Sequence, residues 1–302
     1  MMNLHEIESA ISTATGNTFR IDKQSHVGGG DINTAIKISG TNQGQAGQDY
    51  FLKLNNAQLL GMFEAEAAGL SDMAATGAIR VPKPVCTGIA GSQAFVVMEH
   101  LDIGGRGSMS TFGEQLAQMH RCTCDQFGPK QYGWHRDNTI GSTPQINDWT
   151  QDWVSFWAEH RLGYQIDLAA KRGIGSSAIQ KGENLRERLG DFFSGYEPEV
   201  SLLHGDLWSG NYGFVSDGEA VIFDPATYYG DREADLAMTE LFGGFGGEFY
   251  AGYNASWPLD AGYSVRKLLY NVYHILNHFN MFGGGYGAQA ESMMGQLLAG
   301  VR

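Results

Sequence analysis

The stretch LLHGDLWSGN, residues 202–211, sets charged and polar side chains directly after two leucines. This order predicts the end of a buried strand followed by a tight loop, because its two glycines allow sharp turns. Four side chains of the loop are polar or amphipathic: His204, Asp206, Trp208 and Asn211. They contribute little to a hydrophobic core, so we expect the loop to hold polar atoms in fixed places for a reaction.

The spacing from Asp206 to Asn211 is D-L-x-x-x-N, the spacing of a kinase catalytic loop. Residues 221–223 predict a buried strand that leads into Asp224, where kinases carry the metal-binding Asp of D-F-G. Phosphoryl transfer uses Mg²⁺, and oxygen donors such as Asn211 and Asp224 suit this ion. Asp206 can orient an acceptor hydroxyl and take its proton. The pattern predicts a phosphotransfer site, with a simple strand-end cap as the alternative role for Asp224.

The first hundred residues predict a mainly antiparallel sheet with one helix. Residues 17–39 are typical of a strand, a glycine loop and a second strand, and residues 47–55 and 93–101 predict further strands. Apolar residues recur at helical spacing from Leu59 to Leu70, and Gly77 supplies a stop signal.

This region also carries a possible phosphate-binding set. Three glycines follow one another between two predicted strands: Gly28, Gly29 and Gly30. An ordinary hairpin turn explains them about as well as a phosphate loop does. Lys53 lies within an apolar strand, where it is either an exposed edge charge or a buried group that needs a partner. Glu66, on the following helix, is placed to reach it, and this order of loop, lysine and glutamate is that of kinase N-lobes.

Charged residues also follow the predicted metal-binding Asp. Because Leu236 and Ala237 come directly after Asp235, we expect that carboxylate to be buried and to anchor the backbone of the catalytic loop. Asp231 and Glu233 are expected to be exposed. His204 is expected to support the loop through hydrogen bonds rather than to titrate in catalysis. Four aromatic residues at helical spacing are expected to pack in the core: Trp149, Trp153, Phe156 and Trp157.

Composition limits the class of protein. The 302 residues are 42% hydrophobic and 18% charged, which is typical of a globular chain. A net charge of −13 argues against a general nucleic-acid or membrane-surface role. The three cysteines, Cys86, Cys122 and Cys124, suggest neither disulfides nor zinc. With no signal peptide and no apolar run of roughly 18 residues, we expect a cytoplasmic protein.

With these motifs the sequence resembles the fructosamine (ketosamine) kinase family, a branch of the aminoglycoside-phosphotransferase-like kinases. The resemblance covers almost the whole chain. The motifs of the general kinase core are VGGGDIN at 27–33, FLKLN at 51–55, MFEAEAAGL at 62–70, VMEHL at 97–101, HGDLWSGN at 204–211 and DPATYYGDREADLAMTELFGGF at 224–245. Two stretches and Trp208 are particular to this branch: DNTIGSTPQINDWTQDWVSFWAEHRL at 137–162 and YNVYHILNHFNMFGGGYG at 270–287.

The resemblance implies an α+β, bilobal, protein-kinase-like fold. Its N-lobe, residues 1–100, would be a small antiparallel β-sheet plus a helix, and its C-lobe, residues 101–302, mainly α-helical. It implies an enzyme that uses ATP and Mg²⁺ to phosphorylate the 3-hydroxyl of ketosamines, namely ribulosamine or fructosamine adducts of amines or protein lysines. This reaction is regarded as deglycation repair. The sequence does not decide the oligomeric state, and a monomer is the expectation.

The match also implies a role for each motif residue. It makes Asp206 the catalytic base, Asn211 and Asp224 the metal ligands, and Lys53 with Glu66 the phosphate-positioning pair. Glu99 and Leu101 would belong to the hinge that receives adenine through backbone atoms. The chain departs from the family at Asp31, where several members carry a cysteine, so thiol-based regulation of the glycine loop is not expected.

Three residues are candidates for the substrate side. The indole of Trp208 suits the C–H groups of a sugar, and the alternative is a core Trp that braces the loop. Asn277 and His278 lie on a predicted helix and either face the substrate or pack internally. A kinase of the aminoglycoside or choline type is the alternative activity; a catalytically silent nucleotide-binding module and a metal hydrolase using His204 are the rivals from other classes.

Overall fold

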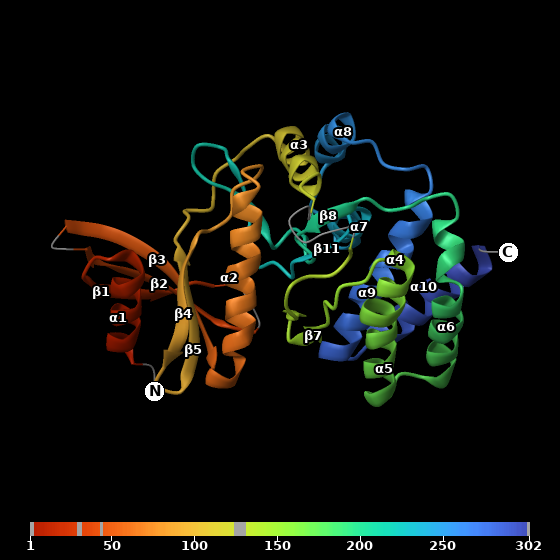
Figure 1. The fold of residues 1–302 in the computed structure, drawn as a ribbon, viewed down its shortest axis with the longest axis horizontal. Helices are drawn as coiled ribbons and strands as arrows, with labels where there is room; N and C mark the ends of the chain where they lie inside the picture. Colours follow the sequence, from red (N-terminus) through yellow and green to blue (C-terminus); the bar gives the residue numbers. More distant parts are fainter. Residues whose placement is uncertain (1–2, 29–31, 43–44, 124–130, 301–302) are drawn as a thin grey trace. The chain divides into compact units, whose positions relative to one another are not determined.

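The computed structural model describes residues 3–28, 32–42, 45–123 and 131–300. The chain forms two compact units (Figure 1), of which the first contains Met1–Gly107 with Gly213–Asp224 and the second Ser108–Tyr212 with Pro225–Arg302. Among the described residues, no helix combines the length and the apolar character that crossing a membrane requires. The predicted mixed α+β fold, with an antiparallel sheet and many helices, is confirmed.

The first unit is built on a five-stranded antiparallel sheet with the order β1-β2-β3-β5-β4. Its strands are β1 (Phe19–His26), β2 (Thr34–Asn42), β3 (Gln45–Asn56), β4 (Pro84–Ala90) and β5 (Gln93–Glu99). Its helices are α1 (Leu4–Thr15), the 3₁₀ turn η1 (Ala57–Leu59) and α2 (Leu60–Ala75). The strands and the helix expected in the first hundred residues are present, and Gly77 follows α2 with a φ of 63°.

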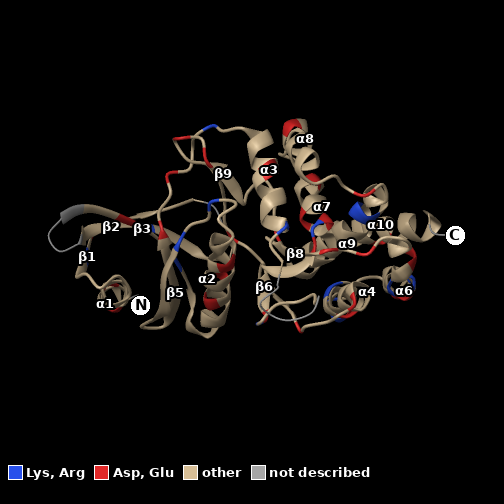
Figure 2. Ribbon diagram, turned by 45° about the horizontal axis from the view of Figure 1, so that its top comes forward, with Lys and Arg blue, Asp and Glu red and all other residues tan. Residues whose placement is uncertain are grey.

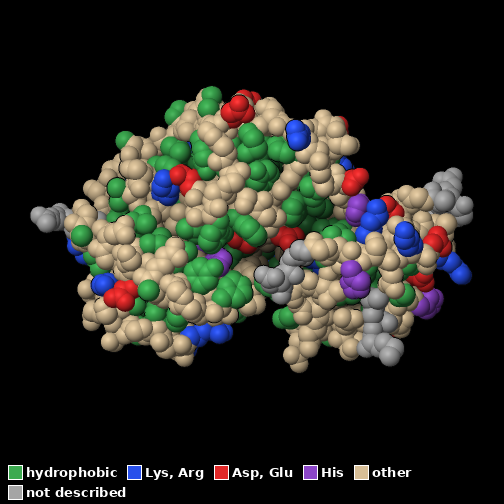
Figure 3. Space-filling view, turned by 180° about the vertical axis from the view of Figure 1, so that it is seen from behind, with side chains coloured by type: hydrophobic (Ala, Val, Ile, Leu, Met, Phe, Trp, Pro, Cys, Tyr) green, Lys and Arg blue, Asp and Glu red, His purple; other side chains and the backbone are tan. Residues whose placement is uncertain are grey.

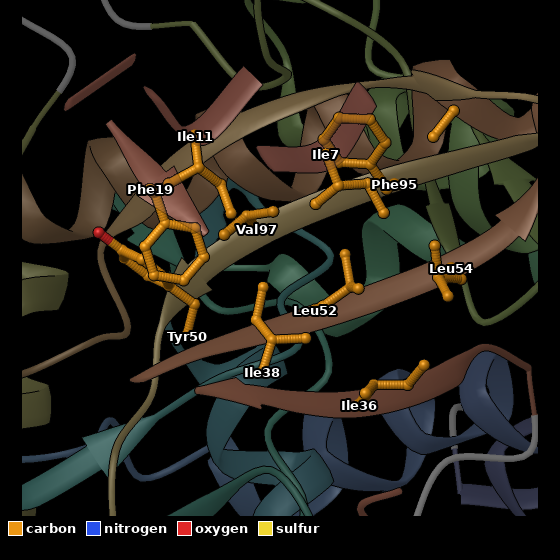
Figure 4. Packing of buried hydrophobic residues seen from close by; sticks show 11 residues of the cluster. Ile7, Ile11, Phe19, Ile36, Ile38, Tyr50, Leu52, Leu54, Phe95 and Val97 are labelled. Carbon is orange, nitrogen blue, oxygen red and sulfur yellow. The ribbon is translucent and has the colours of Figure 1, made fainter. Parts of the chain in front are cut away.

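One face of this sheet is covered by α1, a layer that the sequence analysis did not predict. Ile7 and Ile11 are one helical turn apart and fully buried. They pack against alternate residues of the strands, including Leu52, Leu54 and Val97 (Figure 4). Because side chains alternate along a strand, Lys53 points to the opposite face, which α2 covers (Figure 1).

Residues 213–224 return to the first unit through main-chain hydrogen bonds. The amides of Gly104 and Gly105 donate to the carbonyl of Phe214 at 3.1 and 2.9 Å, and the Ile222 amide donates to Arg80 O at 3.1 Å. A Cβ at position 105 would lie 2.0 Å from Val215 O, so only glycine permits this approach. The sequence had suggested two contiguous parts, 1–100 and 101–302, and gave no sign of this return.

The second unit is mainly helical. Its helices are α3 (Met109–His120), α4 (Trp153–Phe156), the π-helix η3 (Trp157–Gly163), α5 (Tyr164–Lys171), α6 (Ser176–Glu187), the 3₁₀ turn η4 (Leu189–Phe193), α7 (Glu233–Leu241), α8 (Gly247–Ser256), α9 (Tyr263–Phe282) and α10 (Tyr286–Gly300). Short strands pair as β6 (Asn138–Ile140) with β7 (Thr143–Gln145) and β8 (Val200–Leu203) with β11 (Tyr228–Asp231). The pair β9 (Tyr212–Phe214) and β10 (Ala220–Ile222) lies where the chain passes between units.

The aromatic core of the second unit agrees with the sequence except at one position. Trp153, Phe156 and Trp157 are buried and contact one another or Tyr270 at ring-centroid distances of 4.8 to 6.2 Å. Trp149 precedes the helix and is partly exposed, because the helical pattern begins only at residue 153.

Two carboxylates that were expected at the surface are buried, and this prediction is wrong. Asp231 accepts hydrogen bonds from the hydroxyls of Tyr196 at 3.0 Å and Tyr270 at 2.5 Å. Glu233 forms an ion pair with Arg266, whose Nε and Nη2 lie 2.7 and 3.0 Å from its oxygens. Buried charge is tolerated where it is paired and hydrogen-bonded. The acidic residues along α7 (Figure 2) therefore include internal ones.

His274 of α9 gives the unfolding equilibrium a pH dependence. Burial, together with the neighbouring His278, lowers the pKa of His274 to about 3. The unfolded chain binds a proton there near pH 6.5, so protonation favours unfolding. The contribution of His274 to the free energy of unfolding should therefore fall by about 1.4 kcal/mol per pH unit as the pH drops from 6.5 toward 3. Urea titrations across this range should show slopes that differ by about this amount between the wild type and His274→Leu, because the carboxylates that titrate in the same range contribute to both; equal slopes would contradict the assignment.

Candidate active site

The loop after β8 is anchored by a single buried carboxylate. Oδ2 of Asp235, at the start of α7, accepts from the His204 amide at 2.7 Å, and Oδ1 accepts from the Gly205 amide at 2.8 Å. Asp235 is 1% exposed. The predicted anchor of the catalytic loop is thus confirmed, and Asp206 follows directly on the two anchored amides.

A second layer of hydrogen bonds holds Asp235 itself. Nε2 of the buried His120 lies 3.1 Å from Oδ2 of Asp235, and Nδ1 lies 2.8 Å from the Tyr253 hydroxyl. Burial alone would raise the pKa of Asp235, but the hydrogen bond and charge of His120 hold it below its usual value. The anchor is therefore ionised and fixed in orientation. Nothing in the sequence indicated that His120 and Tyr253 support this anchor. His120 lies 115 residues before Asp235.

The backbone of the loop approaches residue 226 closely. The Ala226 amide donates to the His204 carbonyl at 2.8 Å. Gly205 has a φ of 82°, and a Cβ on it would lie 2.0 Å from Ala226 O. Glycine is required here both for the left-handed conformation and for the contact.

Within the loop, backbone and side chains hold one another. The Asp206 amide donates to Nδ1 of His204 at 3.3 Å, so this buried ring supports the loop as expected. Nδ2 of Asn211, which is 6% exposed, donates to the Asp206 carbonyl at 2.8 Å. The Asn211 side chain donates through its amide nitrogen, so its amide oxygen points away from the Asp206 carbonyl. An oxygen of this kind is a ligand that hard cations prefer.

Trp208 is not a core residue. Its side chain is 39% exposed, and its ring lies edge-on to Phe242 at 6.5 Å. A Cβ at Gly210 would lie 2.4 Å from the indole, so the ring folds back over its own loop. Trp208 therefore presents an aromatic surface two residues from Asp206.

In the first unit, Lys53 joins two carboxylates. Its Nζ, on a side chain 7% exposed, lies 2.6 Å from Oε1 of Glu66 and 2.5 Å from Oδ1 of Asp224. Burial alone would lower the pKa of Lys53, but the two carboxylates raise it above its usual value. The lysine is therefore a cation, and the expected pairing with Glu66 is confirmed. Glu64, two residues earlier on the same helix, is exposed.

Asp224 has an unusual backbone. Among the described residues it is the only non-glycine residue with a positive φ, 60°. Such conformations cost energy and gather at functional sites, where surrounding contacts impose them. Its side chain is 44% exposed and contacts Lys53.

The expected nucleotide-binding backbone is described only in part. Gly28 is exposed, and a Cβ on it would meet no heavy atom within 4 Å, whereas Gly29, Gly30 and Asp31 lie outside the described residues. The Glu99 amide donates to Lys83 O at 2.8 Å, and its carboxylate pairs with Arg80 at 2.7 Å. Because the Glu99 amide already donates to Lys83, adenine recognition at Glu99 and Leu101 would have to use their other backbone atoms. Cys86 and Cys122 are free thiols, and Cys124 lies outside the described residues.

With this geometry in view, the chain can be compared with known proteins. The protein-family model described as fructosamine kinase matches residues 3–300. The chain belongs to the fructosamine kinase family. A relative named "Probable ketoamine kinase" from Synechocystis is 49% identical, with 97% of this chain and 96% of the relative covered. The chloroplastic protein-ribulosamine 3-kinase of Arabidopsis thaliana is 44% identical over 94% of this chain and 85% of its own.

Solved structures agree with the family assignment. The crystal structure of a Haemophilus somnus protein named "Putative fructosamine-3-kinase" matches with a TM-score of 0.85 and 31% identity, covering 97% of this chain and 96% of that one. A choline kinase from Streptococcus pneumoniae matches with a TM-score of 0.62 at 14% identity, covering 98% and 99%. The second likeness shows the shared kinase-like fold alone.

In this member of the fructosamine kinase family, one predicted substrate residue is internal. Asn277 is 2% exposed; its Nδ2 donates to Ile140 O and its Oδ1 accepts from Gln165, both at 3.3 Å. Its side chain thus supports the β6–β7 hairpin and is not placed to contact a substrate, which corrects that prediction. His278 is half-buried, and its Nδ1 donates to His274 O at 2.7 Å.

The hairpin β6–β7 contains supporting residues that the sequence did not reveal. Nε2 of the buried Gln145 donates to Ala226 O at 3.1 Å and to Asn138 Oδ1 at 2.8 Å. Nδ2 of Asn138 donates to Thr227 O at 2.7 Å. The hairpin therefore fixes the same residue 226 that packs against the catalytic loop. Buried amide networks of this kind leave no periodic signal in a sequence.

Proposed function

We propose that this chain is an ATP-dependent kinase that phosphorylates the 3-hydroxyl of ketosamines, either ribulosamine or fructosamine adducts of amines or of protein lysines. The observation that carries the proposal is the anchored loop from Asp206 to Asn211 in a chain whose family relatives include a protein-ribulosamine 3-kinase. Phosphorylation of such adducts would serve deglycation repair.

Asp206 is proposed as the general base. It would accept the proton of the 3-hydroxyl while the hydroxyl oxygen forms a bond to the γ-phosphorus of ATP. The bond from that phosphorus to the bridging oxygen breaks, and ADP leaves. Asp206 suits this role because the Asp235 anchor and the Asn211 amide fix its backbone on both sides.

Lys53 is proposed to hold the α and β phosphates, with Glu66 keeping its ammonium in place. Gly28, Gly29 and Gly30 would approach the phosphates through their backbone, and Glu99 with Leu101 would receive adenine. The oxygens of Asn211 and Asp224 are the donors that suit Mg²⁺, so these residues are proposed as its ligands. When bound, Mg²⁺ would neutralise the charge of the phosphates.

On the acceptor side, Trp208 is proposed to pack against the sugar, since its exposed indole lies two residues from Asp206. His278 is proposed as a second contact of the acceptor, farther from Asp206 than Trp208. We further propose that the protein acts as a cytoplasmic monomer, with no nucleic-acid or membrane partner.

A substrate panel tests the activity. Purified protein with Mg-ATP should consume ATP with ribuloselysine or fructoselysine and leave an aminoglycoside and choline unphosphorylated, and ³¹P NMR should place the phosphate on the 3-hydroxyl. EDTA should abolish turnover, and added Mg²⁺ should restore it. Turnover with choline or the aminoglycoside in place of the ketosamines would assign the chain to the alternative activity.

A further inference from the structure

A row of aromatic rings runs from the catalytic loop across the second unit. The ring of Trp208 contacts Phe242, at the end of α7, with 6.5 Å between centroids. Phe242 lies 5.1 Å from the imidazole of His278. His278 in turn lies 5.8 Å from Phe282 and 5.1 Å from Tyr286. All five rings belong to the second unit, so the row is independent of how the two units are placed.

Three rings of the row are exposed. Trp208, Phe242 and Phe282 are 39%, 44% and 57% exposed. Among the described residues of the second unit, Val265 is the only other exposed large hydrophobic residue. On the face shown in Figure 3, hydrophobic side chains likewise reach the surface in groups. Contiguous exposed rings of this kind are typical of binding surfaces, whereas a single exposed apolar residue is not.

The row is longer than one sugar needs. A sugar whose hydroxyl lies at Asp206 can contact Trp208, but His278 and Phe282 lie two and three rings farther along. Ring-to-ring steps of 6.5, 5.1 and 5.8 Å allow the row to span at most about five residues of extended polypeptide. The far rings are therefore available to an acceptor that continues beyond its ketosamine.

We propose that Phe242, His278, Phe282 and Tyr286 form a docking surface for the polypeptide segment that carries a glycated lysine. The inference rests on the proposed function and selects protein-bound over free ketosamines. Aromatic faces bind both the apolar stems and the cationic ends of lysine and arginine side chains. The net charge of −13 favours the approach of such a basic segment. Neighbouring side chains of an extended peptide can contact successive rings.

The test compares a free with a peptide-bound acceptor. Steady-state kinetics would be measured with free ribuloselysine and with a ten-residue lysine-rich peptide that carries one ribulosylated lysine. In Phe282→Ala, kcat/KM for the peptide should fall about tenfold through a higher KM, and kcat/KM for free ribuloselysine should change less than twofold. Val265→Ala, an exposed apolar residue of the same helix outside the row, is the matched control and should alter neither value.

Each other result has a distinct meaning. An equal change for both acceptors in Phe282→Ala, no change for either, or the same peptide-specific loss in Val265→Ala would overturn the docking surface. Wild-type turnover of free ribuloselysine without turnover of the peptide would overturn it as well, and would leave the proposed function intact. Failure of the wild type with both acceptors would instead reject the proposed function.

Discussion

Replacing Asp206 with Asn should lower kcat by about a thousandfold while the Kd for ATP changes less than threefold. The amide keeps the size of the side chain but cannot accept the proton of the acceptor hydroxyl, and general-base catalysis contributes a factor of this order. The loop itself should persist, because Asp235 and Asn211 bind backbone atoms around position 206 rather than depending on its carboxylate alone. Single-turnover kinetics and ATP titration by calorimetry measure the two quantities.

A matched control is available on α5. Asp167 is an exposed carboxylate of the same unit, and Asp167→Asn should retain kcat within twofold. If Asp206→Asn kept more than a tenth of the wild-type kcat, Asp206 would not be the base. A similar loss of ATP affinity would instead indicate that the substitution disrupts nucleotide binding.

Replacing Asp235 with Asn should have the second largest effect and should act on stability and catalysis together. The carboxylate accepts from three donors, namely the amides of His204 and Gly205 and the ring of His120. An amide group has one oxygen, so its NH₂ must face one of these donors inside the protein. An unsatisfied buried donor costs about 1–3 kcal/mol, and a misplaced loop lowers kcat by about a hundredfold.

Urea denaturation and steady-state kinetics measure both effects on the same preparation. Glu240 lies on the same helix and binds Tyr263 and Lys267 instead of the loop. Glu240→Gln should therefore cost at most about 1 kcal/mol and leave kcat within twofold. If Asp235→Asn lost stability but kept its kcat, the carboxylate would hold the fold without setting the geometry of the loop.

Features marked by neighbouring residues could be predicted from the sequence. The Asp235 anchor was predictable because apolar residues follow it directly, and the Lys53–Glu66 pair because a lysine in an apolar strand requires a partner within reach. The spacing of Asp206 and Asn211 likewise belongs to one short loop. The family resemblance then supplied the kinase-like fold.

Features that depend on distant residues could not be predicted. The run from Asp231 to Glu233 reads as a solvated charge cluster, and only the fold brings Arg266 to its second carboxylate. Tyr196 precedes Asp231 in the sequence and Tyr270 follows it, and only the fold brings both hydroxyls to its carboxylate. Asn277 was misplaced for the same reason, since its partners Gln165 and Ile140 lie more than 100 residues earlier.

The return of residues 213–224 to the first unit has a consequence for biosynthesis. A ribosome releases the chain from its N-terminus, and parts of a protein generally fold as they emerge. The carbonyls of Phe214 and Arg80 acquire their partners only when this late segment and the early one are both available. The first unit therefore stays incomplete until residues 213–224 have left the exit tunnel, although all five strands of its sheet emerge much earlier, and Asp224 is among the last groups to join the unit.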